Sequence, residues 1–348
     1  MILSIDGNNI FYRLCSYLAY QNADFLEKPD DFNVLKTRVL SSICNIIEKL
    51  DELPESIFFV VDNDKNWRAD LNLIPYKTSR KYDQPFDREK LKTVIKEFGE
   101  MVKDKFGWCY MNLPGMEGDD LLYFIAEDGF NNRQQSVTIV SSDADIQQLV
   151  KSNGSKYIAV YDASGDKQKF IIDQDYGIVK NDEFNGIFDL PDSFSILHNK
   201  HERINPVEHA FIKIIGGDMG DDVPSVYIKK LNNNKHTSFG NNYTKSMYKK
   251  FEYDKKYGTS LIDTMLNDEY VRRTIASNIL AHMHSNEVNK ISEISNNILR
   301  NMKFVYLHES TYTPEMIEMV KNSLKLYHDD YTMNNLYRDF LKIYKIYK

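Results

Sequence analysis

The sequence predicts an α/β fold in which helices flank a largely parallel central sheet, followed by a helical C-terminal region. The first observation is that short apolar runs of strand length alternate with longer stretches of helical period up to about residue 173. The second is that the strand-like runs stop from about residue 223 onward, where helical segments dominate. We therefore expect one α/β domain over residues 1–200 and a helical domain over residues 201–348.

Five apolar runs bounded by turn residues predict the strands of the sheet. These runs are residues 2–5, 56–61, 137–142, 156–161 and 168–172. Between them, residues 33–50 and 87–106 carry apolar side chains at helical spacing. Residues 174–204 show no clear period and predict a long connection. Asn205 and Pro206 then offer a cap and a first-turn proline for the helix that opens the second domain.

The size and composition of the chain indicate a globular protein. Of its 348 residues, 42% are hydrophobic and 13% aromatic, which allows a sizeable core. Cys15, Cys44 and Cys109 are odd in number, which argues against a disulfide framework and for a reducing compartment. No apolar run approaches the roughly 18 residues that a transmembrane helix needs, and the N-terminus lacks the basic start of a signal peptide. We expect a soluble, cytoplasmic protein that contacts no membrane.

Nine acidic residues lie where a predicted strand ends or a helix begins. They are Asp6, Asp62, Glu117, Asp119, Asp120, Asp143, Asp145, Asp218 and Asp221. Any one of them could be an ordinary turn or cap residue. Their number weakens that interpretation, because sites in open α/β sheets form outside the carboxyl ends of the strands, where these side chains would converge.

A convergent set of carboxylates points to bound cations. Crowded carboxylates repel one another unless cations neutralise them, and hard oxygen ligands favour Mg²⁺ or Mn²⁺. The sequence therefore predicts a divalent-metal site. The net charge of −7 does not exclude a nucleic-acid partner, because the nine acids alone outweigh it and basic residues cluster elsewhere.

Five short motifs carry these acids, and they occur in the order found in one enzyme family. The motifs are Ile5-Asp6-Gly7, Val61-Asp62-Asn63, Glu117-Gly118-Asp119-Asp120, Ser142-Asp143-Ala144-Asp145, and Gly217-Asp218 with Asp221-Asp222-Val223-Pro224. With them the chain resembles the 5′-nuclease family, the flap endonucleases and 5′→3′ exonucleases of PIN-like fold. A further segment is similar to the tailed-phage branch, above all to the phage ribonuclease H that removes RNA primers; it runs from Trp67-Arg68 to Tyr76-Lys77-Thr78-Ser79-Arg80.

The resemblance implies a Mg²⁺-dependent 5′→3′ exonuclease and flap endonuclease with ribonuclease H activity. Two Mg²⁺ ions, replaceable by Mn²⁺, would be held by two groups of acids. The first group is Asp6, Asp62, Glu117, Asp119 and Asp120, and the second is Asp143, Asp145, Asp218 and Asp221. The substrates would be flaps, nicked or gapped duplexes and RNA–DNA hybrids with a free 5′ end. The setting would be phage-type DNA replication and repair in the cytoplasm of a host cell.

Residues 64–90 would form the arch that the family places over its active site. Lys77 and Arg80 match the catalytic basic pair of that arch, which binds the phosphate and offsets charge that develops in the transition state. The arch residues expected to contact nucleic acid are Arg68, Tyr76 and Lys81. Tyr76 could stack on a base, but packing in the core explains this residue equally well. A charged surface loop is the plainer interpretation of the segment, because acids are mixed with the bases.

Residues 205–256 stand where the family carries its duplex-binding helix-hairpin-helix module, but their sequence departs from it. Two closely spaced glycines are absent and Asp222 replaces the usual Asn, which argues against the family's potassium site. Lysines remain, and those expected to contact the duplex backbone are Lys229, Lys230 and Lys245. A solvated lysine-rich face is the alternative.

Two further features have simple interpretations. His198 and His201 could bind zinc, but no Cys or further His completes such a site. Residues 334–348 carry an apolar stripe that is typical of a packed terminal helix. In the phage branch the C-terminal domain meets a single-stranded DNA-binding protein, so the resemblance implies that partner as well, and we expect a monomer.

Other functions stay open from the sequence. A PIN-type ribonuclease that cuts RNA would not need residues 64–90 or the lysines after Asp222. A catalytically silent DNA-structure-binding protein should have lost some of the acids, whereas all nine positions are acidic here. A metal-dependent phosphatase would leave the basic segments without a role.

Overall fold

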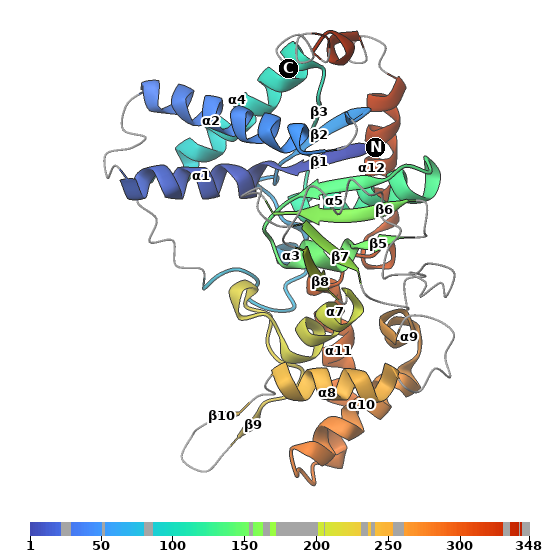
Figure 1. The fold of residues 1–348 in the computed structure, drawn as a ribbon. Helices are drawn as coiled ribbons and strands as arrows, with labels where there is room; N and C mark the ends of the chain where they lie inside the picture. The colour runs from blue at the N-terminus through green and yellow to red at the C-terminus, as the bar shows by residue number, and fades with distance from the viewer. Residues whose placement is uncertain are drawn as a thin grey trace.

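The computed structural model describes residues 1–21, 29–50, 53–79, 86–152, 156–162, 168–171, 201–204, 206–230, 236–237, 241–252, 261–329, 335–340 and 342. Figure 1 shows an upper part built on a sheet and a lower part made of helices. Among all the residues that the structure describes, no helix is both long and apolar enough to cross a bilayer.

An eight-stranded sheet forms the centre of the upper part. Its strands follow the order β3 (Cys109–Met111), β2 (Ser56–Val60), β1 (Ile2–Asp6), β4 (Val137–Val140), β6 (Tyr157–Tyr161), β7 (Gln168–Ile171) and β8 (His201–Ile204), with β5 (Lys151–Ser152) paired to β6. The first five strands of this order run parallel, whereas β7 is antiparallel to β6. Ile2 pairs with Ser56 on one side and Val137 on the other, so the carboxyl ends of β1, β2 and β4 lie together at one edge.

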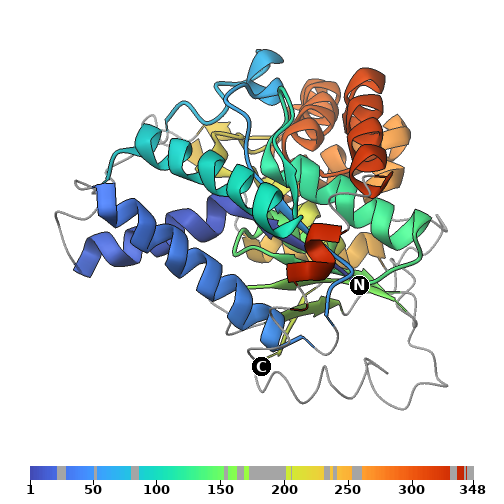
Figure 2. The same cartoon turned by 90° about the horizontal axis from the view of Figure 1, so that it is seen from above.

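Alternate residues of the central strands face two separate cores, as the period of a strand dictates. On one face, Leu3, Ile5 and Phe59 pack with α1 (Gly7–Gln21), α2 (Pro29–Glu48) and α4 (Arg88–Phe106). On the other, Ile2 and Phe58 pack with α5 (Gly118–Glu127) and α12 (Pro314–Asp329). Figure 2 shows these two groups of helices on opposite sides of the sheet. Both faces are therefore covered, which a parallel sheet requires.

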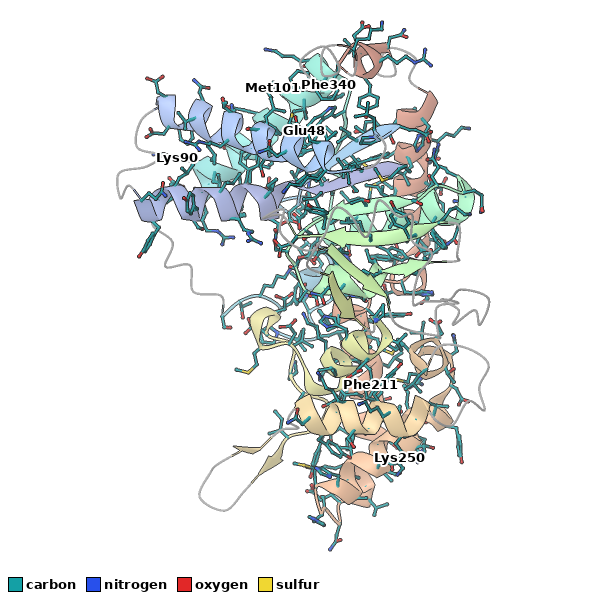
Figure 3. All side chains as sticks on the ribbon, in the orientation of Figure 1. Glu48, Lys90, Met101, Phe211, Lys250 and Phe340 are labelled. Atoms are coloured by element: carbon teal, nitrogen blue, oxygen red, sulfur yellow. The ribbon has the colours of Figure 1, made fainter. Side chains whose placement is uncertain are left out.

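The lower part has its own core, formed mainly by five helices. They are α7 (Pro206–Gly216), α8 (Asn241–Glu252), α9 (Leu261–Asn267), α10 (Glu269–His282) and α11 (Ile291–Val305). Phe211 of α7 is fully buried among them (Figure 3). A short antiparallel pair, β9 (Lys229–Lys230) with β10 (His236–Thr237), extends from this part.

Short helical turns connect the larger elements. They are α3 (Trp67–Asp70), the π-helical turn η1 (Asp128–Asn132), and the 3-10 helices η2 (Asp145–Leu149), η4 (Met219–Asp221), η6 (Val288–Lys290) and η7 (Glu309–Thr311). Of these, η2 and η4 carry acids of the predicted site.

The chain returns from the helical part to the sheet near its C-terminal end. Leu307, Val320 and Leu324 are buried in the same core as α5. Further on, Phe340 packs into the core of α1 and α4, near Met101 in Figure 3. The segment after α11 therefore packs on the upper part, although the predicted domain boundary near residue 200 would assign it to the second domain. The division itself stays a prediction.

The predicted fold class is confirmed, and all five predicted strands are present. The sequence missed β3, β5 and β8 of the large sheet and the pair β9 and β10, because runs of two to four residues give too little pattern to detect. β8 lies at the end of the predicted long connection, of which residues 172–200 lie outside the described residues. Pro206 is the first residue of α7 as expected, whereas its predicted cap, Asn205, falls outside the description.

The remaining predictions about single segments have mixed outcomes. None of the three cysteines, all of which are described, forms a disulfide. Residues 335–340 are helical. Of the predicted stripe, Phe340 is buried and Leu336 half-buried, and Tyr337, which was not predicted, is buried as well; residues 343–348 lie outside the described chain. His198 and the side chain of His201 also lie outside it.

Candidate active site

The acids of the site stand at the carboxyl edge of the sheet because of where three neighbouring strands end. Asp6 is the last residue of β1, Asp62 lies two residues after β2, and Asp143 lies three residues after β4. Asp62 Oδ1 accepts a hydrogen bond from the backbone N–H of Gly118 at 2.7 Å, which ties the end of β2 to the first turn of α5. That turn carries Glu117, Asp119 and Asp120, so most of the first predicted group meets there.

Four of the acids have no basic ion-pair partner among the described residues. They are Asp6, Asp62, Asp119 and Asp143. Burial, together with the charges of Asp62 and Asp143, raises the pKa of Asp6 to about 7. Burial raises the pKa of Asp62, with a further contribution from Glu117. Burial and the charges of Asp143 and Asp6 raise the pKa of Asp119 well above its usual range.

These carboxylates therefore repel one another around Asp6, which is buried, whereas Asp119 and Asp143 are half-buried and Asp62 keeps contact with solvent. Asp6 keeps two hydrogen bonds, accepting from the backbone N–H of Asn9 at 2.9 Å and from Ser141 Oγ at 2.8 Å. Such donors hold the carboxylate in position but carry no full positive charge. We call Asp6, Asp62, Asp119 and Asp143 the unpaired acids.

The other five acids are each held by a basic side chain, and we call them the paired acids. Glu117 accepts from Lys77 Nζ, from Arg68 Nη1 at 2.7 Å and from the Tyr76 hydroxyl at 3.1 Å. Burial alone would raise the pKa of Glu117, but the charges of Lys77 and Arg68 outweigh it and lower this pKa to about 2. Asp221 lies 3.6 Å from Lys77 Nζ and 3.1 Å from the same tyrosine hydroxyl.

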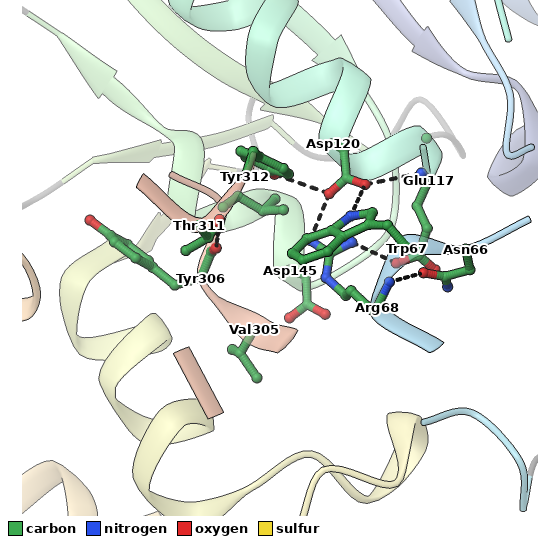
Figure 4. Close-up of polar contacts among 12 residues, drawn as sticks. Asn66, Trp67, Arg68, Glu117, Asp120, Asp145, Val305, Tyr306, Thr311 and Tyr312 are labelled. Carbon is green, nitrogen blue, oxygen red and sulfur yellow. Dashed lines mark hydrogen bonds and ion pairs between the residues drawn. The ribbon is translucent and has the colours of Figure 1, made fainter. Parts of the chain in front are cut away.

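Asp120 is the most completely enclosed of the paired acids (Figure 4). It has no exposed surface, and its Oδ1 accepts from Arg68 Nη2 at 2.6 Å and from the Tyr312 hydroxyl at 3.0 Å. Its Oδ2 accepts from Trp67 Nε1 and from the backbone N–H of Glu117, both at 3.0 Å. The Glu117 bond is half of a capping box that starts α5.

Arg68 is only 2% exposed, and its guanidinium bridges Glu117 and Asp120 while it stacks on Trp67. The prediction that Arg68 contacts nucleic acid is therefore wrong: its charge is used inside the protein. Tyr76 is 6% exposed and its ring packs against Phe304, which favours core packing over base stacking for this residue.

The acids of η2 and η4 meet through Lys213, a residue of α7 that the sequence did not single out. Lys213 Nζ binds Asp145, and it lies 2.7 Å from Asp218 Oδ2. Burial raises the pKa of Asp145 to about 6 in spite of this lysine. For Asp218, the hydrogen bond and charge of Lys213 outweigh burial and lower the pKa.

Lys77 connects the predicted arch to both parts of the molecule. Its backbone N–H donates to the carbonyl of Asp221 at 3.0 Å, and its φ of +56° is rare for a residue with a side chain. Asp222, at φ +59°, accepts from the backbone N–H of Ser79 at 2.7 Å. Residues 77–79 of the predicted arch are therefore held against the loop that follows α7.

Several other predicted site residues cannot be placed as fully. Arg80 and Lys81 lie outside the described residues. Lys229 and Lys230 form β9, but their side chains are not described. Lys245 is exposed on α8.

A cavity of about 230 Å³ opens beside the acids. Asp62, Glu117 and Lys77 are among the residues that line it. Arg88, Lys92 and Lys96 line it as well, one helical turn apart on α4. Acidic and basic groups therefore share the lining of one open space.

A family model described as 5′-3′ exonuclease, N-terminal resolvase-like domain, matches residues 1–181, which is more than half of the chain. The chain belongs to this 5′→3′ exonuclease family. Among curated protein sequences, no match was found.

Two solved structures of one protein from bacteriophage T5 are similar to this exonuclease-family chain over nearly its whole length. One was co-crystallised with metal ions; it is 14% identical, with a TM-score of 0.50 over 98% of both chains. The other is a variant flap endonuclease in a pseudo-enzyme–product complex with DNA and metal ions; it is 13% identical, with a TM-score of 0.51 over 99% of both chains. At this identity the two likenesses show the fold, and they extend it beyond residue 181.

The carboxylates of the site are chemically suited to bind a divalent cation. Their present arrangement, however, is not that of a metal site. Hard oxygen donors with raised pKa values are what such a cation would stabilise in the ionised form. Within the described residues, however, no group of three or more His, Cys, Asp or Glu side chains is arranged to hold a metal. The paired acids form ion pairs with Lys77, Arg68 and Lys213 instead of binding a cation.

Proposed function

We propose that the chain is a structure-specific, divalent-metal-dependent 5′ nuclease. It hydrolyses phosphodiester bonds near the 5′ ends of flaps, nicked or gapped duplexes and RNA primers on DNA. The observation that carries the proposal is the set of unpaired acids, which gather around the buried Asp6 at the carboxyl edge of the sheet in a member of the 5′→3′ exonuclease family. A DNA and metal complex of a protein with this fold supports the choice of substrate.

The unpaired acids would hold the first cation, and paired acids would join once a lysine moves away. Glu117 becomes available when Lys77 leaves it, and Asp145 with Asp218 when Lys213 leaves them. Two bound Mg²⁺, or Mn²⁺ in their place, would supply an activated water and stabilise charge on the scissile phosphate. We expect no potassium site at the loop that contains Asp222.

Lys77 is the residue of the arch that would act on the substrate. Its side chain is 22% exposed and lines the cavity beside Asp62 and Glu117. When Lys77 exchanges Glu117 for the scissile phosphate, its charge offsets the negative charge that develops in the transition state. Arg80 is assigned the same task from the sequence alone.

Duplex binding would come from the lysines after Asp222. Lys245, Lys249 and Lys250 are exposed on α8, where they can contact phosphates without reading bases. Lys229 and Lys230 would contribute from β9. The specificity would therefore come from duplex shape and a free 5′ end, in phage-type replication and repair, with a single-stranded DNA-binding protein as the partner of the C-terminal region.

The test is cleavage of end-labelled 5′-flap, nicked, RNA–DNA hybrid and single-stranded RNA substrates, with Mg²⁺ and with EDTA. We expect cutting of the first three only with Mg²⁺. Lys77→Met should lower kcat about 10²- to 10³-fold while duplex binding in EDTA changes little. Lys342→Met is the matched control, since this lysine is exposed and pairs with Asp339 far from the acids.

Three results would overturn the proposal in different ways. Cutting of single-stranded RNA alone would favour the PIN-type ribonuclease. Cutting that survives EDTA would exclude metal dependence. Equal losses of cutting and binding in Lys77→Met would remove the catalytic role of this lysine.

A further inference from the structure

Asp120 has no lone pair left for a metal ion. An ionised carboxylate offers about four acceptor sites on its two oxygens. Arg68, Tyr312, Trp67 and the backbone of Glu117 occupy two on each oxygen, at 2.6–3.0 Å. With no exposed surface, Asp120 also has no path to a cation in solution.

The Asp120 network fixes the position of Glu117. The backbone N–H of Glu117 donates to Asp120, and Arg68 joins the two side chains from one guanidinium. Trp67 completes the arrangement by stacking on Arg68 and donating to Asp120. Glu117 can therefore not shift without breaking bonds that are buried on all sides.

One of the four donors comes from the far end of the chain. Residues 305–312, which we call the strap, lead from α11 back to the sheet (Figure 4). The strap ends at Tyr312, whose ring is 6% exposed and packs on Trp67 and Phe124 with centroids 5.6 Å and 4.9 Å away. Its hydroxyl donates to Asp120.

The strap also contacts η2, the element that begins at Asp145. Gln148 Nε2 donates to the carbonyl of Val305 at 3.0 Å, and Gln148 Oε1 accepts from the backbone N–H of Leu307 at 2.9 Å. The same short segment thus binds the start of α5 through Tyr312 and η2 through Gln148. These two elements carry acids of both predicted metal groups.

We propose that Asp120 is a positioning residue and not a metal ligand, and that Tyr312 of the strap holds it in that role. The inference rests on the proposed metal-dependent function. It gives a part of the chain beyond residue 181, outside the matched family domain, a direct share in the active site. It also replaces the prediction that Asp120 ligates metal.

The test is Tyr312→Phe, which removes the hydroxyl and keeps the ring. We expect the dissociation constant of Mg²⁺, measured by calorimetry without substrate, to rise about tenfold, as is typical when the hydrogen bonds that orient a ligand are weakened. The Mg²⁺ concentration for half-maximal cleavage should rise by the same factor, and kcat at saturating Mg²⁺ should recover. Emission of Trp67, which touches both Tyr312 and Asp120, gives a local check of the network.

Tyr337→Phe is the matched control. This tyrosine is also buried and its hydroxyl also donates a hydrogen bond, but to the carbonyl of Pro54 in the other core. It should leave Mg²⁺ affinity unchanged. All titrations are made well below the melting temperature of the least stable protein, so that unfolding does not enter.

The outcomes separate this inference from the proposed function. If wild type binds Mg²⁺ and both tyrosine variants bind it equally well, Tyr312 is an ordinary core residue and the inference fails. If Tyr312→Phe weakens Mg²⁺ binding but no 5′-ended DNA is cut by the wild type, the positioning role stands and the nuclease proposal fails. A wild type that binds no Mg²⁺ overturns the metal dependence on which both rest.

Discussion

The paired and unpaired acids lie within one site, yet their charges are balanced in opposite ways. Glu117, next to Lys77 and Arg68, has its pKa lowered to about 2, whereas Asp6 has its pKa raised to about 7. Both are buried, so burial does not distinguish them. The difference is the presence of a basic partner. The comparison shows that basic side chains of the protein neutralise the charge of the paired acids, whereas the charge of the unpaired acids remains to be neutralised by a bound cation.

The largest effect should come from removing the partner of a paired acid. Arg68→Met leaves Asp120 charged and without exposed surface, which should lower the free energy of unfolding by about 3–5 kcal/mol. Urea unfolding measures it. Arg273→Met is the control, because Arg273 is 46% exposed and its pair with Glu269 should contribute within about 1 kcal/mol. Equal losses in the two variants would break the distinction between buried pairing and surface pairing.

Much of this arrangement follows from the sequence, and some of it does not. The acids were predicted because each ends a strand or starts a helix, and strand order then brings them together. Arg68 was misassigned because its neighbours Lys65 and Lys77 suggested a basic surface, and nothing local reveals that two acids far along the chain enclose it. Lys213 stands five residues before Asp218, which lies beyond the end of α7, so the pair has neither the i,i+3 nor the i,i+4 spacing that signals a contact on a helix.

Tyr312 could not be found from the sequence. Its contact with Asp120 spans 192 residues and depends on the return of the chain from α11 to the sheet. No motif surrounds it, and the helical pattern on either side predicts only a connection. Long-range packing of this kind is decided by the tertiary fold and leaves no local signal.

The pH dependence of stability should separate Asp6 from Glu117 by sign. In metal-free protein, Asp6 has a raised folded pKa, so its contribution is present below about pH 4 and is lost as pH rises through about 7. Glu117 has a lowered folded pKa, so its contribution is present above about pH 4.5 and is lost as pH falls toward about 2.

Between about pH 5 and about pH 8, the acids with raised pKa values, Asp6 and Asp145 among them, should therefore dominate. We expect the free energy of unfolding in EDTA to fall across this range by an amount on the order of a few kcal/mol, and to fall less in Asp6→Asn. Urea unfolding at several pH values measures it. A stability that rises across the range in the wild type would contradict the assignment of Asp6.

The smallest effect should come from an acid outside both sets. Asp222 accepts from the backbone of Ser79 and sits at φ +59°, a conformation that Asn adopts readily. Asp222→Asn should stay within about 0.5 kcal/mol of the wild type in unfolding free energy and cut flaps at an unchanged rate. Its neighbour Asp221, a paired acid, should lose cutting when changed to Asn. If Asp222→Asn lost flap cutting as Asp221→Asn does, Asp222 would belong to the active site as well.

The central claim is that the unpaired acids repel one another until they bind a divalent cation. Asp119→Asn tests it most directly. The melting midpoint is measured for the wild type and this variant at about pH 8, where the wild-type repulsion is greatest, in EDTA and in MgCl₂. We predict that in EDTA the variant melts above the wild type, because one repelling charge is gone. Mg²⁺ should then raise the midpoint of the wild type and leave that of the variant nearly unchanged. A variant that melts below the wild type in EDTA, and gains as much from Mg²⁺, would contradict the account.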